Sequence, residues 1–111
     1  MSYSVTPLEI FKKAAKRLIK KYPSLKNELL ELTRLLLVNP TFGTSLGNNV
    51  FKIRISIKSK GSGKSGGARV ITYIVTENKE IYLLTIYVKS ELNTLDDNAL
   101  RKIIKSINKE P

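Results

Sequence analysis

The sequence predicts one small α+β domain over residues 1–111. Its parts are a short N-terminal strand, a helical hairpin, a three-to-four-stranded, mainly antiparallel sheet, and a C-terminal helix. The length of 111 residues suits a single modest hydrophobic core. Apolar residues recur at helical spacing before residue 40 and after residue 94, whereas three runs between residues 50 and 89 have the pattern of strands. The helices are expected on one face of the sheet, and the other face can stay open.

The N-terminal segment predicts a strand followed by a helix. Ser2 to Val5 suits a short strand, and Thr6-Pro7-Leu8-Glu9 has the pattern of a helix start, with a threonine cap and proline in the first turn. The helix should end near Tyr22, because Pro23 disfavours helical backbone before it. Six cations fill its outer face, which suits either a nucleic-acid contact or an ordinary solvated exterior: Lys12, Lys13, Lys16, Arg17, Lys20 and Lys21.

A second helix is predicted from Ser24 to Val38, because leucines recur along it at helical spacing. Asn39-Pro40 should end this helix, and the very short turn between the two helices predicts an antiparallel hairpin. Thr41 to Asn49 contains two glycines and is predicted as a loop.

Three strands are predicted next, at Val50–Lys58, Arg69–Thr76 and Ile81–Lys89. A tight hairpin at residues 77–80 should join the second strand to the third, which is the most apolar and is expected inside the sheet. A last helix is predicted from about Thr94, where acidic residues suit a helix N-terminus.

The composition excludes several classes of site. The chain has no cysteine and no histidine, so it has no disulfide, no thiolate zinc site and no catalytic triad with histidine. Its nine acidic residues are scattered, which argues against a carboxylate-bound metal, and we expect neither metal nor cofactor. No apolar run reaches about 20 residues and no signal peptide is evident, so a cytoplasmic protein without a membrane segment is expected.

The net charge of +11 points instead to a polyanionic partner, and the stretch from Val50 to Val70 concentrates the signal. This stretch holds six basic residues and no acidic one. Strand alternation places Phe51 and three isoleucines on one face, with Lys52 and Arg54 on the other. A loop of only lysine, serine and glycine follows, from 58 to 67, but its spacing does not match a phosphate-binding P-loop.

These cations suit chemistry on RNA, which carries its own nucleophile in the ribose 2′-hydroxyl. Arginine can bind a phosphate with two hydrogen bonds and stabilise its charge in the transition state, and lysine or tyrosine can take part in proton transfer. The candidate catalytic residues are Lys52, Arg54, Arg69, Lys64 and Tyr87. The candidate RNA-binding residues are Lys58, Lys60 and Lys89. A phosphate-binding patch without turnover is the alternative interpretation.

Two motifs resemble the RelE/ParE toxin superfamily, and its RelE- and HigB-like members most of all. They are N-P-x-x-G-x-x-L-G-N-N-V-F-K-I-R, from Asn39 to Arg54, and G-K-S-G-G-A-R-V-I, from Gly63 to Ile71. The resemblance implies a compact RelE-like fold, cleavage of mRNA in the ribosomal A site, and neutralisation by an antitoxin. By position, Lys52 and Arg54 match the family's basic pair, Arg69 its arginine after the loop, and Lys89 its basic cluster after the last strand.

The sequence departs from the RelE pattern near its C-terminus. Ser90, Glu91 and Leu92 stand where RelE is richer in arginine, and no tyrosine follows Tyr87. The resemblance therefore predicts a metal-independent mRNA interferase, with mRNA, the ribosome and a cognate antitoxin as partners. The antitoxin should offer an acidic, partly disordered segment to the basic domain. A ParE-like topoisomerase poison and a non-catalytic nucleic-acid-binding domain are the alternatives.

Overall fold

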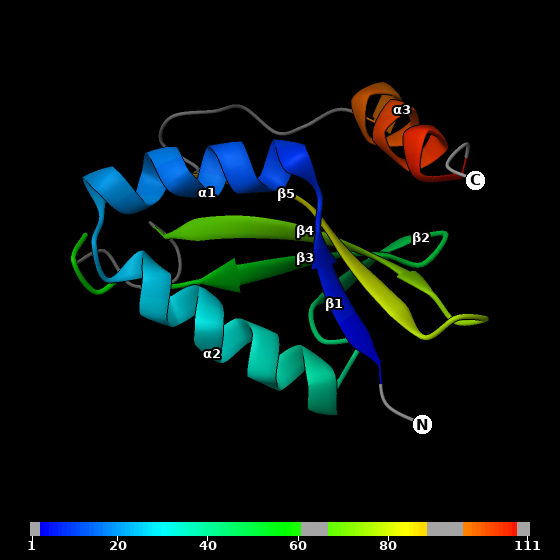
Figure 1. Cartoon of the computed structure of the whole chain (residues 1–111), viewed down its shortest axis with the longest axis horizontal. Helices are drawn as coiled ribbons and strands as arrows, with labels where there is room; N and C mark the ends of the chain where they lie inside the picture. The colour runs from blue at the N-terminus through cyan, green and yellow to red at the C-terminus, as the bar shows by residue number, and fades with distance from the viewer. Residues whose placement is uncertain (1–2, 61–66, 89–96, 109–111) are drawn as a thin grey trace.

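The computed structural model describes residues 3–60, 67–88 and 97–108, and it confirms the α+β domain. A five-stranded sheet of order β1-β5-β4-β3-β2 carries α1 and α2 on one face, while α3 packs against the other (Figure 1). The strands are β1 Ser4–Pro7, β2 Thr44–Gly47, β3 Val50–Ile55, β4 Ala68–Val75 and β5 Glu80–Val88. The helices are α1 Glu9–Lys21, α2 Leu25–Val38 and α3 Asp97–Asn108.

The sheet has one more strand than the largest number predicted. β2 lies in the segment predicted as a loop and pairs antiparallel with the start of β3. Its four residues are all exposed, so they lack the apolar alternation from which a strand is recognised. Gly47, Asn48 and Asn49 have φ of 89°, 53° and 64°, and this left-handed backbone turns β2 directly into β3.

The predicted helix start at Thr6-Pro7 is wrong, because these two residues belong to β1. β1 runs parallel to β5, and the backbone N–H of Leu8 still donates to the Leu83 carbonyl at 3.0 Å. The Thr6 hydroxyl donates to the Glu80 carboxylate instead of capping a helix. Pairing with β5 thus overrides the local capping pattern, and α1 begins at Glu9 without a side-chain cap.

Alternate residues of the central strands feed two separate cores. The main core, under α1 and α2, contains Leu18, Leu25, Ile53, Val70 and Ile86, each at most 1% exposed. The second core joins Leu100 and the isoleucines of α3 to the opposite face of the sheet, which is therefore not open as expected. None of the described helices is long and apolar enough to cross a membrane.

Candidate nucleic-acid interface

Arg54, Arg69 and Tyr87 form one transverse row across β3, β4 and β5. Arg54 is the direct cross-strand partner of Arg69, and Arg69 is the direct partner of Tyr87. Directly paired residues project from the same face of a sheet, so these side chains share the face opposite α1 and α2. Lys52 lies two residues before Arg54 and projects from that face as well. The strand alternation predicted from the sequence is confirmed here.

The members of this row lie at different depths. Arg54 is exposed and Lys52 is half-buried, whereas Arg69 is only 3% exposed and Tyr87 only 4%. One arm of the Arg69 guanidinium, Nη1, donates to the Ala68 carbonyl at 3.3 Å. An incoming phosphate would therefore meet Arg54 first, with the charge of Arg69 behind it.

The Arg54–Arg69 pair is electrostatically unfavourable by itself. Directly opposed residues in an antiparallel pair have β-carbons about 4.5–5.5 Å apart, and like charges at that spacing repel. Within the described ranges Arg54 makes no ion pair. A bound anion would reduce the repulsion between the two guanidinium groups, so the arrangement favours a site for phosphate.

Gly67 fixes where the lysine- and glycine-rich loop rejoins the sheet. A β-carbon at residue 67 would lie 2.0 Å from the carbonyl oxygen of Ile55, so only glycine fits against the end of β3. The next residue, Ala68, pairs with Ile55 and leads directly into Arg69. This close backbone approach holds Arg69 opposite Arg54, and nothing in the sequence pattern alone had identified Gly67 as the critical glycine.

The structure places the remaining predicted residues apart from this row or leaves them undescribed. Lys58 is exposed in the turn after β3, where its backbone N–H donates to the Glu28 carboxylate of α2 at 2.7 Å. Lys60 is half-buried, with its Nζ 5.7 Å from the centre of the Tyr22 ring at the end of α1. Lys64 and Lys89 lie outside the described residues.

Tyr87 belongs to the second core, together with Val50, Ile71 and Leu100. Its burial against α3 makes it a packing residue in this structure and keeps its ring from stacking on a base. Tyr73 and Tyr82 stack on each other at the same core, with ring centroids 6.5 Å apart.

The accessible chemistry is cationic. The described residues contain no group of three or more histidine, cysteine or acidic side chains that could hold a metal ion. Arg54 and Lys52, backed by Arg69, can bind a phosphodiester and stabilise additional negative charge on it.

Comparisons with known proteins agree with this fold. A family model described as the RelE toxin of the RelE/RelB toxin–antitoxin system matches residues 8–110. The chain is also similar to a solved structure of the E. coli toxin RelE, a double arginine-to-alanine mutant in the free state. That match has a TM-score of 0.61 and 16% sequence identity, and it covers 96% of this chain and 99% of the E. coli chain.

Proposed function

The chain belongs to the RelE family of toxins from toxin–antitoxin systems, and from this membership we propose that it cleaves messenger RNA on the ribosome. The single observation that carries the proposal is the exposed Arg54, held beside the buried charge of Arg69. Both lie in a chain that has no histidine and no cysteine. The proposed enzyme is a cytoplasmic, metal-independent endoribonuclease with the ribosome-bound message as its substrate.

The reaction uses the nucleophile that RNA already carries. The 2′-oxygen forms a bond to phosphorus as the bond from phosphorus to the 5′-oxygen breaks, leaving a 2′,3′-cyclic phosphate and a 5′-hydroxyl. One proton must leave the 2′-hydroxyl and another must reach the 5′-oxygen. Negative charge grows on the non-bridging oxygens between these events, and cations placed there lower the barrier.

Arg54 is the direct phosphate ligand in this proposal, and the burial of Arg69 gives it a supporting electrostatic role. A charge that water screens poorly acts more strongly on a neighbouring phosphate than an exposed charge does. Lys52, on the same face, serves as the general base or as a further charge stabiliser, a role that Lys64 could share. Lys58, Lys60 and Lys89 contribute to RNA binding, and Tyr87 supports the row by packing.

The test is cleavage of a defined message in a purified translation reaction, read by primer extension. Arg54→Ala should lower the cleavage rate by about 10²–10³-fold, the loss typical of removing one group that stabilises transition-state charge. Arg34→Ala is the matched control, because it removes one exposed arginine from α2, whose partner is the exposed Glu31 at 2.8 Å. Undiminished cleavage by the Arg54 variant would overturn the assignment of this site.

Two further arms separate the alternatives. The same message without ribosomes tests whether cleavage needs translation, and a chelator selective for transition metals tests metal independence while leaving ribosomal Mg²⁺ in place. Inhibition of DNA supercoiling without RNA cleavage would identify a topoisomerase poison. RNA binding that tolerates Arg54→Lys, with no cleavage by the wild type, would identify a simple binding domain.

A further inference from the structure

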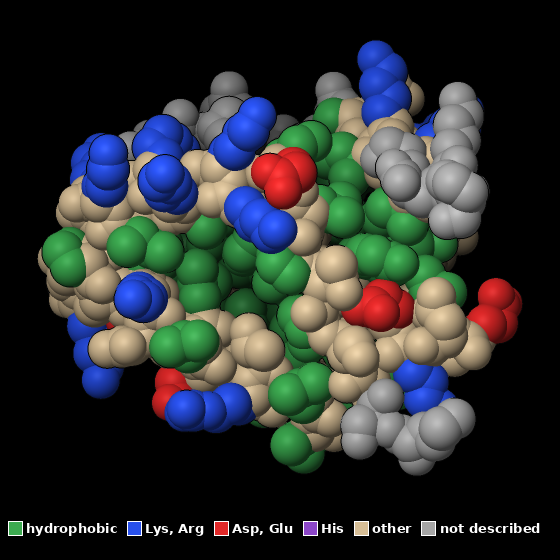
Figure 2. All heavy atoms as spheres, viewed as in Figure 1, with side chains coloured by type: hydrophobic (Ala, Val, Ile, Leu, Met, Phe, Trp, Pro, Cys, Tyr) green, Lys and Arg blue, Asp and Glu red, His purple; other side chains and the backbone are tan. Residues whose placement is uncertain are grey.

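A second surface, on the opposite side of the sheet, has the character of a protein-binding groove. It runs along α1 and has a volume of about 450 Å³. Its floor is apolar, formed by Pro7, Phe11, Ala15 and Ile19, and its rim is formed by Lys12, Lys16 and Lys20. Figure 2 shows hydrophobic side chains gathered between α1 and α2, with lysines along α1 above them.

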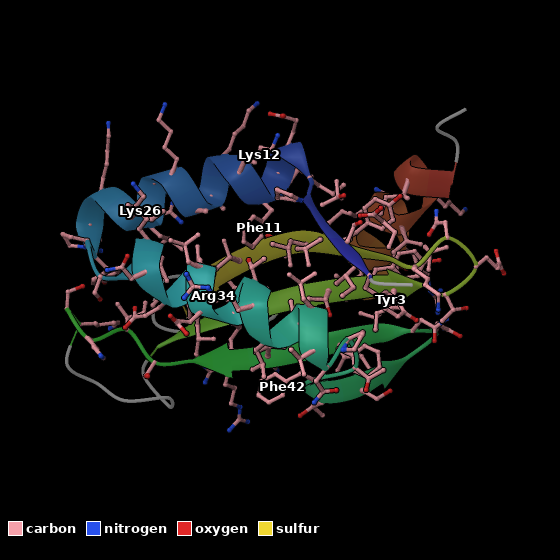
Figure 3. The ribbon with its side chains drawn as sticks, turned by 60° about the horizontal axis from the view of Figure 1, so that its bottom comes forward. Tyr3, Phe11, Lys12, Lys26, Arg34 and Phe42 are labelled. Atoms are coloured by element: carbon pink, nitrogen blue, oxygen red, sulfur yellow. The ribbon has the colours of Figure 1, made fainter. Side chains whose placement is uncertain are left out.

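The wall across from α1 is also apolar. Leu30 and Leu37 of α2 are 53% and 45% exposed, and seven residues place them on nearly the same side of the helix. Leu35 lies about 140° around α2 from Leu30 and lines a different hollow, beside β3. Leu30 and Leu37 must therefore face the α1 side, where Lys26 also projects between the helices (Figure 3).

The rim has a regular spacing. Lys12, Lys16 and Lys20 recur every fourth residue, so they follow one side of α1 at steps of about 6 Å. Lys12 has an exposed partner in Glu9 at 3.5 Å, a contact that water screens strongly. In the part of the chain that the structure describes, Lys16 and Lys20 make no ion pair. A second helix with a carboxylate at every fourth position would match these steps.

We propose that this groove binds an amphipathic, acidic helix of the antitoxin, with leucine-like side chains on the apolar floor and carboxylates against Lys12, Lys16 and Lys20. The inference rests on the proposed function only for the identity of the partner as an antitoxin. Charge complementarity favours this occupant over a second copy of the chain, whose net charge is +11. The Lys12–Lys20 rim lies over the face of the sheet opposite Arg54, so binding here leaves the candidate RNA site uncovered.

The probe is a synthetic, end-capped peptide of about 14 residues, long enough to follow the groove as a helix. It carries leucines along one stripe and glutamates at every fourth position beside that stripe, and a control peptide has lysines in place of the glutamates. Calorimetric titration of the full chain should show binding of the acidic peptide and none of the basic one. Lys16→Glu and Leu30→Lys should each weaken binding by at least about tenfold.

Leu35→Lys is the matched control, since it makes the same change at an exposed leucine on the other side of α2. It should change the affinity by less than about twofold. No binding of the acidic peptide, or equal affinity for the wild type and the two groove variants, would overturn the proposal. A dimer of the free chain that Leu30→Lys dissociates would also overturn it, because the groove would then be a self-association surface.

The groove and the RNA site can fail independently. Lys16→Glu and Leu30→Lys should keep the wild-type rate of message cleavage. If the wild type binds the peptide but cleaves no message, the groove stands and the proposed nuclease activity falls. If the wild type cleaves and the peptide does not bind, the reverse holds.

Discussion

Arg54 and Arg69 face each other directly across β3 and β4, yet only Arg54 reaches the surface. The register fixes their pairing, and Gly67 fixes the approach of the two strands at that end. The pair thus combines an accessible ligand for phosphate with a second charge that water screens poorly. Each arginine should therefore respond differently to substitution.

Removing Arg54 should weaken binding of single-stranded RNA and also make it less sensitive to salt. Each phosphate neutralised on a single strand contributes about 0.7 to the slope of log affinity against log salt concentration. Arg54→Ala should reduce that slope by about this amount, measured by fluorescence anisotropy with a labelled oligonucleotide. Arg34→Ala should leave the slope unchanged, and an unchanged slope in both variants would mean that Arg54 touches no phosphate.

Replacing Arg69 with lysine should cost stability as well as activity. Lysine keeps the charge but lacks the planar fork, one arm of which donates to the Ala68 carbonyl at 3.3 Å. The free energy of unfolding in urea should fall by about 1–3 kcal/mol, because the group is buried. Arg54→Lys, at the surface, should stay within about 0.5 kcal/mol of the wild type. Equal stability of the two variants would contradict the difference in depth.

Gly67→Ala should be among the most damaging single-methyl changes in the chain. The new β-carbon would overlap the Ile55 carbonyl at 2.0 Å, so the backbone of β3 or β4 must move. A loss of at least about 3 kcal/mol is expected in urea unfolding. Gly47→Ala meets no atom within 4 Å and carries only the strain of φ +89°, so it should cost about 1–2 kcal/mol. Similar losses at both positions would exclude the close approach as the cause.

Thr72→Val should stabilise the protein. The Thr72 hydroxyl is fully buried beside an irregularity in the β4–β5 pairing and has no hydrogen-bond partner in the described structure. Valine has nearly the same shape, so the change removes an unsatisfied polar group and should add about 1 kcal/mol to the free energy of unfolding. Thr33→Val is the control and should not stabilise, because the Thr33 hydroxyl donates to the Leu29 carbonyl at 3.0 Å. A destabilised Thr72 variant would show that the hydroxyl is satisfied in solution.

Periodicity was sufficient to predict most of the elements. α2 lies within a residue of its predicted start, and β4 and β5 match their predicted runs to within about one residue at each end. The loop predicted at Thr41–Asn49 contains β2, because a short, fully exposed strand has no apolar face from which to recognise it. The helix predicted from Pro7 starts two residues later, because β1 finds hydrogen-bond partners more than 70 residues away.

The candidate site was predictable in face but not in depth. Alternation along β3 placed Lys52 and Arg54 on one side of the strand, and the structure agrees. Burial of Arg69 depends on how the sheet and its neighbours pack around it, and no local pattern encodes that. The groove along α1 escaped prediction for a similar reason, because the outer lysines were recognised but the angle between α1 and α2 was not.

The parallel pairing of β1 with β5 has a consequence for how the protein is made. Ser4 lies beside Glu80, so the first strand to leave the ribosome waits for almost the last one before it can pair. The helices need only neighbouring residues, whereas this contact closes a very long loop and raises the contact order of the domain. A nascent chain therefore cannot complete its sheet until β5 has emerged, and a truncated product should remain unfolded.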